Sequence, residues 1–461
     1  MIRLFKHYIP HAVILLWLVD LTMLVAANEM SWRLRAGQIG IEIGSMTDRA
    51  WAHFGFAAMV VTAMIAVGVY GADALRSMRF AAARLLVAIS LGVIALSFLD
   101  FLIGGQTFWR STLAYSMAIA FCLLIADRLI LGGFLGTSAF RRRVLVLGAG
   151  NRAQRLRQLG DRPESGFAIV GYVGMSEAAP VIEEAIPRAA IHNLTRYVEN
   201  LGVSEVVLAL EERRNALPLK DLLRIKTAGV HVNEFSSFLE RETGRVDLGT
   251  VNPSWLIFSD GFSSGRMISS AAKRVFDIGA SALLLVITAP VILVFAILVK
   301  LDSKGPAFYR QKRVGLFGQS FDVIKLRSMR TDAEAAGAQW ASKDDPRVTR
   351  IGNFIRKVRI DELPQTWTVL KGEMSFVGPR PERPEFVADL EEHLPYYAER
   401  HMVKPGITGW AQINYPYGAS IEDSRNKLEY DLYYAKNYTP FLDLLILLQT
   451  LRVVLWSEGA R

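Results

Sequence analysis

The sequence has a single cysteine, and it contains no basic motif of the kinds that recognise nucleic acids. Cys122 lies inside an apolar run, so neither a disulfide within the chain nor a cysteine metal site is available. The net charge of +9 suits contact with anionic lipid or phosphate, but without a recognition motif it predicts no nucleic-acid partner. No small-residue cleavage site follows the first apolar segment, so we expect no cleaved signal peptide.

Long apolar runs are abundant instead. Hydrophobic residues make up 51% of the 461 residues, too many for an ordinary soluble protein and too few for a chain wholly inside a membrane. This length allows two or three domains. Four apolar stretches predict four spanning helices within residues 1–140. They are roughly Ile9–Ala27, Phe54–Tyr70, Leu85–Ile103 and Leu113–Leu135. Basic residues favour alternate loops, which predicts that both ends of this region face the cytoplasm.

The surroundings of the first stretch hold two irregular features. The loop expected after it fits the rule for basic residues poorly, because it contains Arg33, Arg35 and Arg49. Asp20 lies within the span itself, where an ionisable side chain is a functional candidate. A hydrogen bond that packs one helix against another is the alternative for Asp20, and we favour it.

The chain after the fourth stretch predicts a separate α/β module. An expected strand at Val144–Leu147 runs into the turn Gly148-Ala149-Gly150 and then into a helix, with Ala153 at the third small position. This opening is typical of a Rossmann-like unit. The strands and helices expected after it are Phe167–Val173, Leu194–Leu201, Glu205–Leu210 and Leu217–Ala228. We therefore predict a parallel α/β domain over residues 141–258, followed by a linker rich in serine and glycine at residues 259–270.

Two interpretations of this module remain open. A lone glycine fingerprint is a weak signal, and no clear acidic residue ends a second strand ~20 residues further on, where a dinucleotide site needs one. A structural or regulatory role is therefore favoured over nucleotide binding.

The apolar run Asp277–Val299 has basic residues at both ends and a proline, Pro290, in its middle. About 23 residues at ~1.5 Å each are just enough to cross a bilayer. Cationic flanks belong on the cytoplasmic side, however, and here both flanks are cationic. Proline also removes a backbone donor and breaks a helix. We therefore predict a re-entrant membrane helix over residues 277–299 that bends at Ala289-Pro290 and returns to the side from which it came.

Charged side chains concentrate beyond this run. Asp361 and Glu362 are adjacent, and the sequence predicts a helix that starts with Asp361 as its N-cap and stops at Gly372. The helix dipole, together with Arg356 and Arg359, would keep Asp361 ionised despite the neighbouring Glu362. Asp361 is therefore a candidate nucleophile or metal ligand.

Short segments with cations, prolines and glycines surround this pair. Arg310 and Lys312 belong to a cationic cluster, and the strand pattern at residues 321–329 places Lys325 and Arg327 on one face. Two later segments, Val377–Pro381 and Lys404–Asn414, combine turn-fixing prolines with glycines. Such glycines let backbone N–H groups approach a ligand.

These motifs resemble those of the bacterial sugar transferases, the monotopic polyprenyl-phosphate sugar-1-phosphate transferases that start glycan assembly. The resemblance covers about Lys273 to the C-terminus in the family's order and spacing. It rests on Lys325–Met329, Asp361–Gln365, Val377–Pro381 and Pro405–Gln412. The layout also resembles the large members, which join four spans and a Rossmann-like module to the catalytic domain. It implies a mixed α/β catalytic domain over residues 271–461 that contains the re-entrant helix.

The resemblance implies a mechanism. Asp361 would attack the sugar-linked phosphate of a UDP-sugar, release UMP and pass the phosphosugar to undecaprenyl phosphate. Glu362, with Asp361, would hold Mg²⁺. The phosphate- and substrate-contacting positions of the family match Lys325, Arg327, Arg356, Pro379, Arg380, Arg310, Lys312 and Gln412.

The family also implies a biological setting. The expected enzyme is a homodimer in the bacterial inner membrane with its catalytic domain on the cytoplasmic face, acting in exopolysaccharide, capsule or O-antigen synthesis. A UDP-glucose or UDP-galactose donor is expected, with amino-sugar donors open. One departure concerns the membrane bend, where members often have serine before the proline and this chain has Ala289.

Two other functions compete with this one. A membrane-anchored nucleotide-sugar dehydratase or epimerase normally needs a Tyr-x-x-x-Lys pair, and no tyrosine in the chain has lysine four residues later. A scaffold that recruits later glycosyltransferases through the α/β module would not need the Asp361-Glu362 pair.

Overall fold

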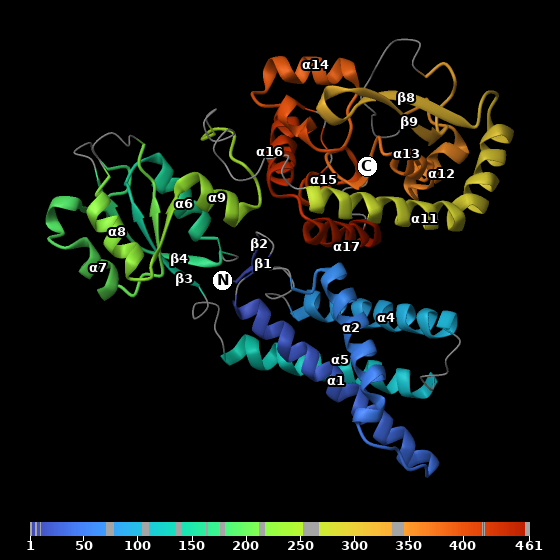
Figure 1. Ribbon diagram of the computed structural model, residues 1–461, viewed down its shortest axis with the longest axis horizontal. Helices are drawn as coiled ribbons and strands as arrows, with labels where there is room; N and C mark the ends of the chain where they lie inside the picture. The colour runs from blue at the N-terminus through green and yellow to red at the C-terminus, as the bar shows by residue number, and fades with distance from the viewer. Residues whose placement is uncertain are drawn as a thin grey trace. The chain divides into compact units, whose positions relative to one another are not determined.

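The structure, a computed structural model, is shown in Figure 1. It describes residues 2–4, 7–9, 11–70, 78–103, 110–134, 141–162, 165–175, 180–211, 217–251, 267–333, 345–416, 418 and 420–456. The chain divides into two compact units, Met1–Gly244 and Arg245–Arg461. The predicted linker at residues 259–270 lies outside the described residues except for its last four, which are helical.

The first unit begins with a short antiparallel hairpin, β1 (Ile2–Leu4) and β2 (His7–Ile9), and continues into apolar helices. The helices are α1 (His11–Ile39), α2 (Ala50–Val67), α4 (Met78–Ile103) and α5 (Arg110–Phe134), with a 3-10 turn at Thr47–Arg49. All four helices are long and apolar enough to cross a membrane, as the sequence predicts. Their shared core includes the fully buried side chains of Leu24, Phe56, Leu85 and Leu124.

Helix α1 is longer than expected, because it continues to Ile39 instead of ending near Ala27. Arg33 and Arg35 therefore belong to the helix, and the prediction that they lie in a loop is wrong. Glu29, on the same helix, accepts from Arg33 at 2.7 Å and from Arg49 at 3.0 Å. The Glu29 carboxylate therefore neutralises part of the positive charge of Arg33 and Arg49, two of the basic residues that fit the rule for basic loops poorly.

Asp20 has the packing role that the sequence favours. Its carboxylate is fully buried and accepts from both terminal nitrogens of Arg128 on α5, at 3.0 and 2.7 Å. Arg128 also donates to Asp127 at 2.7 Å. A buried charge needs such a partner, so this ion pair fastens α1 to α5.

A five-stranded parallel sheet forms the middle of the chain, as predicted. Its order is β5 (Ile186–Pro187), β4 (Phe167–Gly174), β3 (Arg142–Leu147), β6 (Glu205–Leu208) and β7 (His231–Glu234). The helices are α6 (Asn151–Gly160), α7 (Leu194–Asn200), α8 (Leu219–Thr227) and α9 (Phe235–Thr243), with a 3-10 turn at Arg188–Ala190. Val144 and Val146 of β3 pack with α6 and α9, whereas Leu145 and Leu147 pack with α7 and α8. The helices therefore cover both faces of the sheet (Figure 1).

The glycine turn after β3 is filled by the chain itself. A Cβ atom on Gly148 would lie 2.5 Å from the carbonyl oxygen of Ala209, and one on Gly150 would lie 2.6 Å from Oε1 of Glu211. The same Oε1 accepts from the N–H of Asn151 at 2.9 Å, at the first turn of α6. A dinucleotide places its phosphates at this helix end. A protein carboxylate in that position favours the structural interpretation of the module.

The second unit is mixed α/β, as predicted, and it contains the long apolar helix α11 (Met267–Asp302). Strands β8 (Phe308–Val314) and β9 (Ser320–Leu326) form an antiparallel hairpin, and β10 (Ser375–Val377) pairs in parallel with β11 (Gly406–Thr408). The remaining helices are α12 (Arg350–Lys357), α13 (Gln365–Lys371), α14 (Pro384–His393), α15 (Trp410–Asn414), α16 (Ile421–Asn437) and α17 (Pro440–Trp456). Short 3-10 turns are η3 (Leu316–Gly318), η4 (Ile360–Glu362) and η5 (Ala398–Met402).

The last described residues before α11 belong to this second unit. Val246 and Leu248 are buried against Leu390 and Leu428, and the N–H of Val246 donates to the carbonyl of Glu429. The predicted domain boundary at residue 258 lies among residues that the structure does not describe, so it stays a prediction.

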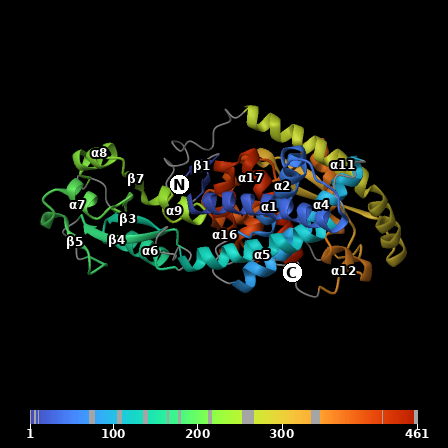
Figure 2. The same cartoon turned by 90° about the horizontal axis from the view of Figure 1, so that it is seen from below.

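Helix α11 contains Pro290 and changes direction along its length, as both views show (Figure 1, Figure 2). Proline leaves the carbonyl four residues earlier, that of Val286, without its helical donor. The preceding residue, Ala289, has no hydroxyl, but Thr288 donates to the carbonyl of Leu284 at 2.7 Å. Hydroxyl bonding of this kind often bends helices. Two features therefore favour a bend here: Pro290 lacks an N–H donor, and the hydroxyl of Thr288 bonds a helix carbonyl. Thr288 lies one residue before the position where family members often have serine.

The first end of α11 is tied to the second unit by polar contacts. Arg274 donates to the carbonyls of Val369 and Leu370, each at 2.8 Å. Asp277 accepts from the hydroxyl of Ser375 at 3.1 Å and from the N–H of Phe376 at 3.2 Å. These contacts fix the start of the helix against α13 and β10.

The other end of α11 is tied to the same unit. Arg327 donates to the carbonyls of Ser303 at 2.6 Å and Lys304 at 2.9 Å. Val299 is buried against Leu326 and Ile355. Between the two ends, apolar side chains are exposed, among them Leu283, Val286, Ile287 and Leu293 at 62–75%. The helix thus leaves the unit, presents an apolar surface, and comes back to it.

The Asp20–Arg128 pair yields a stability prediction. Arg128→Met should destabilise the first unit by about 3–5 kcal/mol, because it leaves a buried carboxylate unpaired. Because Arg128 also pairs with the buried Asp127, the triple variant Asp20→Leu, Asp127→Leu and Arg128→Met should recover most of this loss. Arg33→Met, which removes a side chain that is 70% exposed, is the matched control and should change little. Thermal unfolding in detergent measures all three variants, and an unstable triple variant would contradict the explanation.

Candidate active site

Asp361 lies in the 3-10 turn η4, between α12 and α13, and is 8% exposed. The preceding Arg359 has a φ of +61°, in the left-handed region that few residues other than glycine adopt. Helix α13 starts only after Pro364, so the prediction that Asp361 is the N-cap of this helix is wrong. Its predicted end is confirmed, because Gly372 closes it with a φ of +94°.

Glu362 is surrounded by cations. Its Oε1 lies 3.3 Å from Nζ of Lys325, 3.3 Å from a guanidinium nitrogen of Arg380 and 3.7 Å from one of Arg359. Burial by itself would raise the pKa of the Glu362 carboxyl, but Lys325, Arg380 and Arg359 together hold that pKa well below its usual range. Burial lowers the pKa of Lys325, which Glu362 opposes. Glu362 is therefore a fixed anion that holds cations in the site.

Asp361 has the opposite electrostatic character. Burial, and then the charge of Glu362, raise the pKa of its carboxyl to about 6 against the pull of Lys325, Arg359 and Arg356. Desolvation outweighs the pull of the two arginines on this pKa, but a pKa of about 6 still leaves the carboxyl mostly ionised at neutral pH, the state that the sequence predicts. The buried Oδ1 of Asp361 has no hydrogen-bond partner among the residues that the structure describes. A carboxyl group that is mostly ionised at neutral pH and has one oxygen without a hydrogen-bond partner is suited to nucleophilic attack.

Two cationic residues of the site were missed by the sequence reasoning. The sequence predicts for Arg359 only a general effect of its charge on Asp361, but its guanidinium lies 3.7 Å from Oε1 of Glu362. Arg313 donates to the carbonyl of Pro381 at 2.9 Å and to Oε1 of Gln311 at 2.9 Å. The β8–β9 register pairs Tyr309 with Lys325, and alternation puts Gln311 and Arg313 on that same face. Extending the strand pattern backward through the hairpin would have found Arg313.

Lys325 and Arg327 do not act on the same group, although the sequence predicts that they share a face. Strand β9 ends at Leu326, and Arg327 turns to the end of α11. Arg327 is 5% exposed, so its guanidinium is committed to these carbonyls.

Three further predicted residues lie away from the Asp361-Glu362 pair. Arg310 and Lys312 face the opposite side of the β8–β9 hairpin from Lys325, and they line a separate pocket. Gln412 donates to the carbonyl of Ile407 at 3.3 Å, which ties α15 to β11.

The glycines of the two proline-rich segments bring two backbones together. The N–H of Gly378 donates to the carbonyl of Thr408, and the N–H of Gly406 donates to the carbonyl of Pro379, each at 2.9 Å. A Cβ atom on Gly378 would lie 2.2 Å from the carbonyl oxygen of Lys404. The interpretation that these glycines open the backbone to a ligand is therefore wrong at Gly378 and Gly406. They position the loop that carries Arg380 and the buried Pro379.

Arg400 supports the same loop from behind. It is 4% exposed and donates to Asp431 at 2.7 and 3.0 Å and to the hydroxyl of Tyr397 at 2.9 Å. Its Nη2 also donates to the carbonyl of Arg380 at 2.9 Å. No motif points to Arg400, because two of its partners, Asp431 and the carbonyl of Arg380, are distant in sequence.

A divalent cation fits the site through few protein ligands. Among the described residues there is no cluster of three or more His, Cys, Asp or Glu side chains. Mg²⁺ is commonly bound by one or two carboxylates together with substrate phosphates, so it does not need such a cluster. The adjacent carboxylates of Asp361 and Glu362 would supply the hard oxygen donors that Mg²⁺ prefers.

Comparison with protein families agrees with this architecture. Residues 268–457 match the family described as bacterial sugar transferase, and residues 65–227 match a CoA-binding domain.

Three curated relatives are informative. A UDP-N-acetylgalactosamine-undecaprenyl-phosphate N-acetylgalactosaminephosphotransferase of Aeromonas hydrophila is 42% identical over 52% of this chain and 56% of its own length. A UDP-glucose:undecaprenyl-phosphate glucose-1-phosphate transferase of Xanthomonas campestris pv. campestris is 32% identical over 73% of this chain and 72% of its own. An uncharacterized sugar transferase of Haemophilus influenzae is 31% identical over 77% and 78%. The chain thus spans about half of the first relative and most of the other two.

The close backbone contact at Gly378 can be tested by one methyl group. Gly378→Ala should destabilise the second unit by at least about 2 kcal/mol, because the new Cβ would overlap a carbonyl oxygen. Gly279→Ala is the matched control, since nothing lies within 4 Å of a Cβ there and alanine favours a helix. Thermal unfolding compares the two. Equal stability of both variants would show that the segments do not meet as described.

Proposed function

The chain belongs to the bacterial sugar transferase family, and on that premise we propose that it transfers a sugar-1-phosphate from a UDP-sugar to undecaprenyl phosphate, releasing UMP. The observation that carries this proposal is the buried, unpartnered Oδ1 of Asp361 beside the cations that Glu362 holds. A carboxylate nucleophile and a concentration of positive charge are what phosphoryl transfer requires.

The reaction has two displacements at one phosphorus atom. In the first, Oδ1 of Asp361 attacks the sugar-linked phosphorus, and the bond from that phosphorus to the bridging oxygen breaks, so that UMP leaves with the electron pair. In the second, an oxygen of the lipid phosphate attacks the same phosphorus, and the bond to Asp361 breaks. The carboxylate is regenerated, so the cycle needs no external oxidant or reductant.

Cations around Asp361 supply the electrostatic part of catalysis. Lys325, Arg380 and Arg359 are already gathered on Glu362, so little reorganisation is needed when the donor's phosphates arrive. Arg356 contributes positive charge from the last turn of α12. When bound by Asp361, Glu362 and the donor, Mg²⁺ would offset phosphate charge and stabilise UMP as the leaving group.

The contacts of α11 support the membrane position that we propose. Both ends of the helix contact the same unit, which supports the re-entrant arrangement and opposes a full crossing. Each limb of about 12 residues is ~18 Å long, enough to enter one leaflet. We place the active site on the cytoplasmic face of the bacterial inner membrane, where UDP-sugars are available and a lipid phosphate can reach Asp361. The expected homodimer stays a prediction.

For the transferred sugar we propose glucose. The Xanthomonas relative, which aligns along most of both chains, is named for glucose, whereas the Aeromonas relative is named for N-acetylgalactosamine. UDP-galactose is a further candidate donor. A panel of UDP-sugars with undecaprenyl phosphate separates these donors by the release of UMP.

Asp361→Asn should lower UMP release by about a thousandfold or more, because the amide is not a nucleophile. Asp389→Asn, at an exposed carboxylate on α14, is the matched control and should keep wild-type activity. A scaffold would tolerate Asp361→Asn and still assemble with its partners. Unchanged UMP release in this variant, measured with Mg²⁺ present, would reject the enzymatic proposal.

The raised pKa of Asp361 predicts an acid limb in the pH profile. Below a pH of about 6 the carboxyl is protonated, so kcat/KM for UMP release should fall as the pH falls. Glu362→Gln removes a charge that raises this pKa. The acid limb of the residual activity should therefore move to lower pH, and a limb that moves upward or stays would contradict the assignment.

The re-entrant arrangement predicts that Ser270 and Ser303 lie on the same side of the membrane. In a Cys122→Ser background, single cysteines introduced at these two positions should both react with an impermeant maleimide in inside-out vesicles and not in intact cells. Labelling of the two positions from opposite sides would mean that α11 crosses the membrane.

A further inference from the structure

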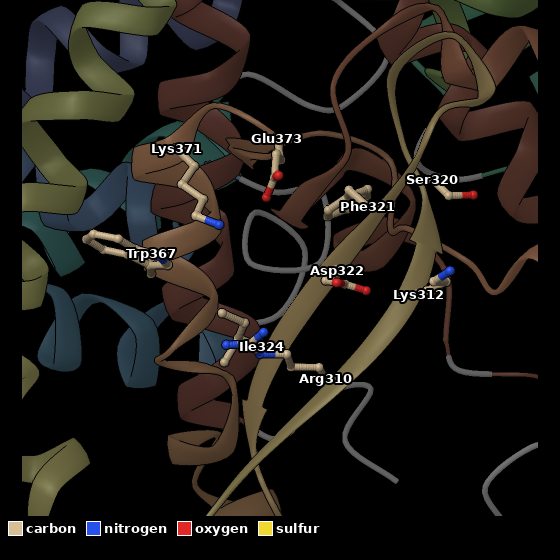
Figure 3. Close-up of a pocket in the computed structure, with 9 residues that line it drawn as sticks. All are labelled: Arg310, Lys312, Ser320, Phe321, Asp322, Ile324, Trp367, Lys371 and Glu373. Atoms are coloured by element: carbon tan, nitrogen blue, oxygen red, sulfur yellow. The ribbon is translucent and has the colours of Figure 1, made fainter.

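A second concave site lies beside the active site. It is a pocket of about 360 Å³ between the β8–β9 hairpin and helix α13 (Figure 3). Its lining is polar, charged and aromatic, and consists of Arg310, Lys312, Ser320, Phe321, Asp322, Ile324, Trp367, Lys371 and Glu373. A pocket of this size accommodates a small molecule.

The charges of this pocket are not paired with one another. Three cationic side chains and two carboxylates line it, and none of the five forms a side-chain hydrogen bond or ion pair with another described residue. They are Arg310, Lys312, Lys371, Asp322 and Glu373. Even Lys312 and Asp322, directly opposite in the hairpin register, form no ion pair. In Figure 3, Lys371 and Glu373 reach toward the hairpin, and Arg310 extends from β8 toward α13. These groups are available to a ligand that carries both anionic groups and hydrogen-bond donors.

Aromatic surface accompanies the charges. Trp367 on α13 is 48% exposed, although tryptophan is usually largely buried. An exposed indole ring offers a face on which a base can stack, and such stacking is largely independent of the identity of the base.

The pocket adjoins the site of the chemistry. Ile324 lines it, and the next residue, Lys325, faces the other side of the hairpin and contacts Glu362. Trp367 follows Asp361 by six residues, a path of about 10 Å along helical backbone. Because the pocket and Lys325 lie on opposite faces of the hairpin, a donor bound in the pocket would have to extend past β9 to reach Oδ1 of Asp361.

We propose that this pocket binds the uridine nucleotide portion of the donor, with the base on Trp367, the ribose hydroxyls on Asp322 or Glu373, and the nucleotide phosphate on Arg310. The assignment rests on the proposed function and adds the place where the donor is recognised. A lipid phosphate is a poorer occupant, because it has no diol to satisfy two carboxylates that would repel its charge.

Equilibrium binding of UMP to the purified full-length protein tests this assignment without turnover. Trp367→Ala and Arg310→Gln should each weaken UMP binding about tenfold, the effect expected from one stacked ring or one phosphate contact. Trp367→Phe should keep most of the affinity, since it retains a stacking face. Arg425→Gln, at an exposed arginine on α16, is the matched control and should leave it unchanged.

Steady-state kinetics show whether the pocket binds the UDP-sugar or the lipid phosphate. Trp367→Ala and Arg310→Gln should raise KM for the UDP-sugar and leave KM for undecaprenyl phosphate unchanged. The inference is overturned if UMP affinity is the same in both variants and wild type, or if the KM for the lipid rises instead. Thermal unfolding checks folding, and the exposed Arg310→Gln keeps the test valid if Trp367→Ala is unstable.

Failure of the inference differs from failure of the proposed function. If wild-type protein releases UMP and Asp361→Asn does not, but the pocket variants bind UMP normally, only the pocket assignment is wrong. If wild-type protein releases no UMP with any donor, the proposed function is wrong, and loss of UMP binding in Trp367→Ala would still support a nucleotide site.

Discussion

The attachment of both ends of α11 to one domain is the constraint on which the rest of the second unit depends. An apolar helix seeks lipid, whereas Arg274 at one end and Arg327 at the other bind backbone carbonyls of the same polar fold. Neither end can move to the opposite side of a bilayer without breaking these bonds. The helix therefore fixes how deep the domain sits, and Asp361 is held at that depth.

The Arg274 end of α11 also contacts the segment that precedes Arg380. Lys273, next to Arg274, donates to the carbonyl of Val377 and to Asp443, and the hydroxyl of Tyr434 lies within hydrogen-bond distance of both acceptors. Val377 directly precedes the segment that carries Arg380. The start of α11 and the segment before Arg380 thus share one hydrogen-bond network. A disturbance at the membrane end would be transmitted to the position of Arg380 over a few covalent and hydrogen bonds.

Burial divides the two adjacent carboxylates into different roles. Both are removed from water, which alone would raise both pKa values, but only Glu362 has cations in direct contact. Glu362 therefore stays ionised and gathers positive charge, while Asp361 keeps a raised pKa and an oxygen without a partner. If both carboxylates were equally paired, neither would be free to attack phosphorus. If neither were paired, the two like charges would disfavour the ionised pair.

Local sequence was sufficient for some of these features and insufficient for others. Pro290 with its cationic flanks predicted the bend, and adjacency alone predicted the Asp361-Glu362 site. The alternation of a strand predicted the face of Lys325 but not that β9 ends one residue before Arg327, since strand ends depend on tertiary contacts. Arg400 was invisible because Asp431 and the carbonyl of Arg380 meet it only in the folded chain.

The glycines of the sequence motifs share one ambiguity. A glycine in a motif indicates that something approaches the backbone closely, but it does not say whether that is a ligand or another part of the chain. At Gly378 the neighbour is the backbone of Lys404, and at Gly150 it is the carboxylate of Glu211. In both cases the neighbour occupies the space that a phosphate would need. In the proposed function, phosphate binding therefore rests on the side-chain cations gathered by Glu362, and Gly378 and Gly406 place the segment that carries Arg380.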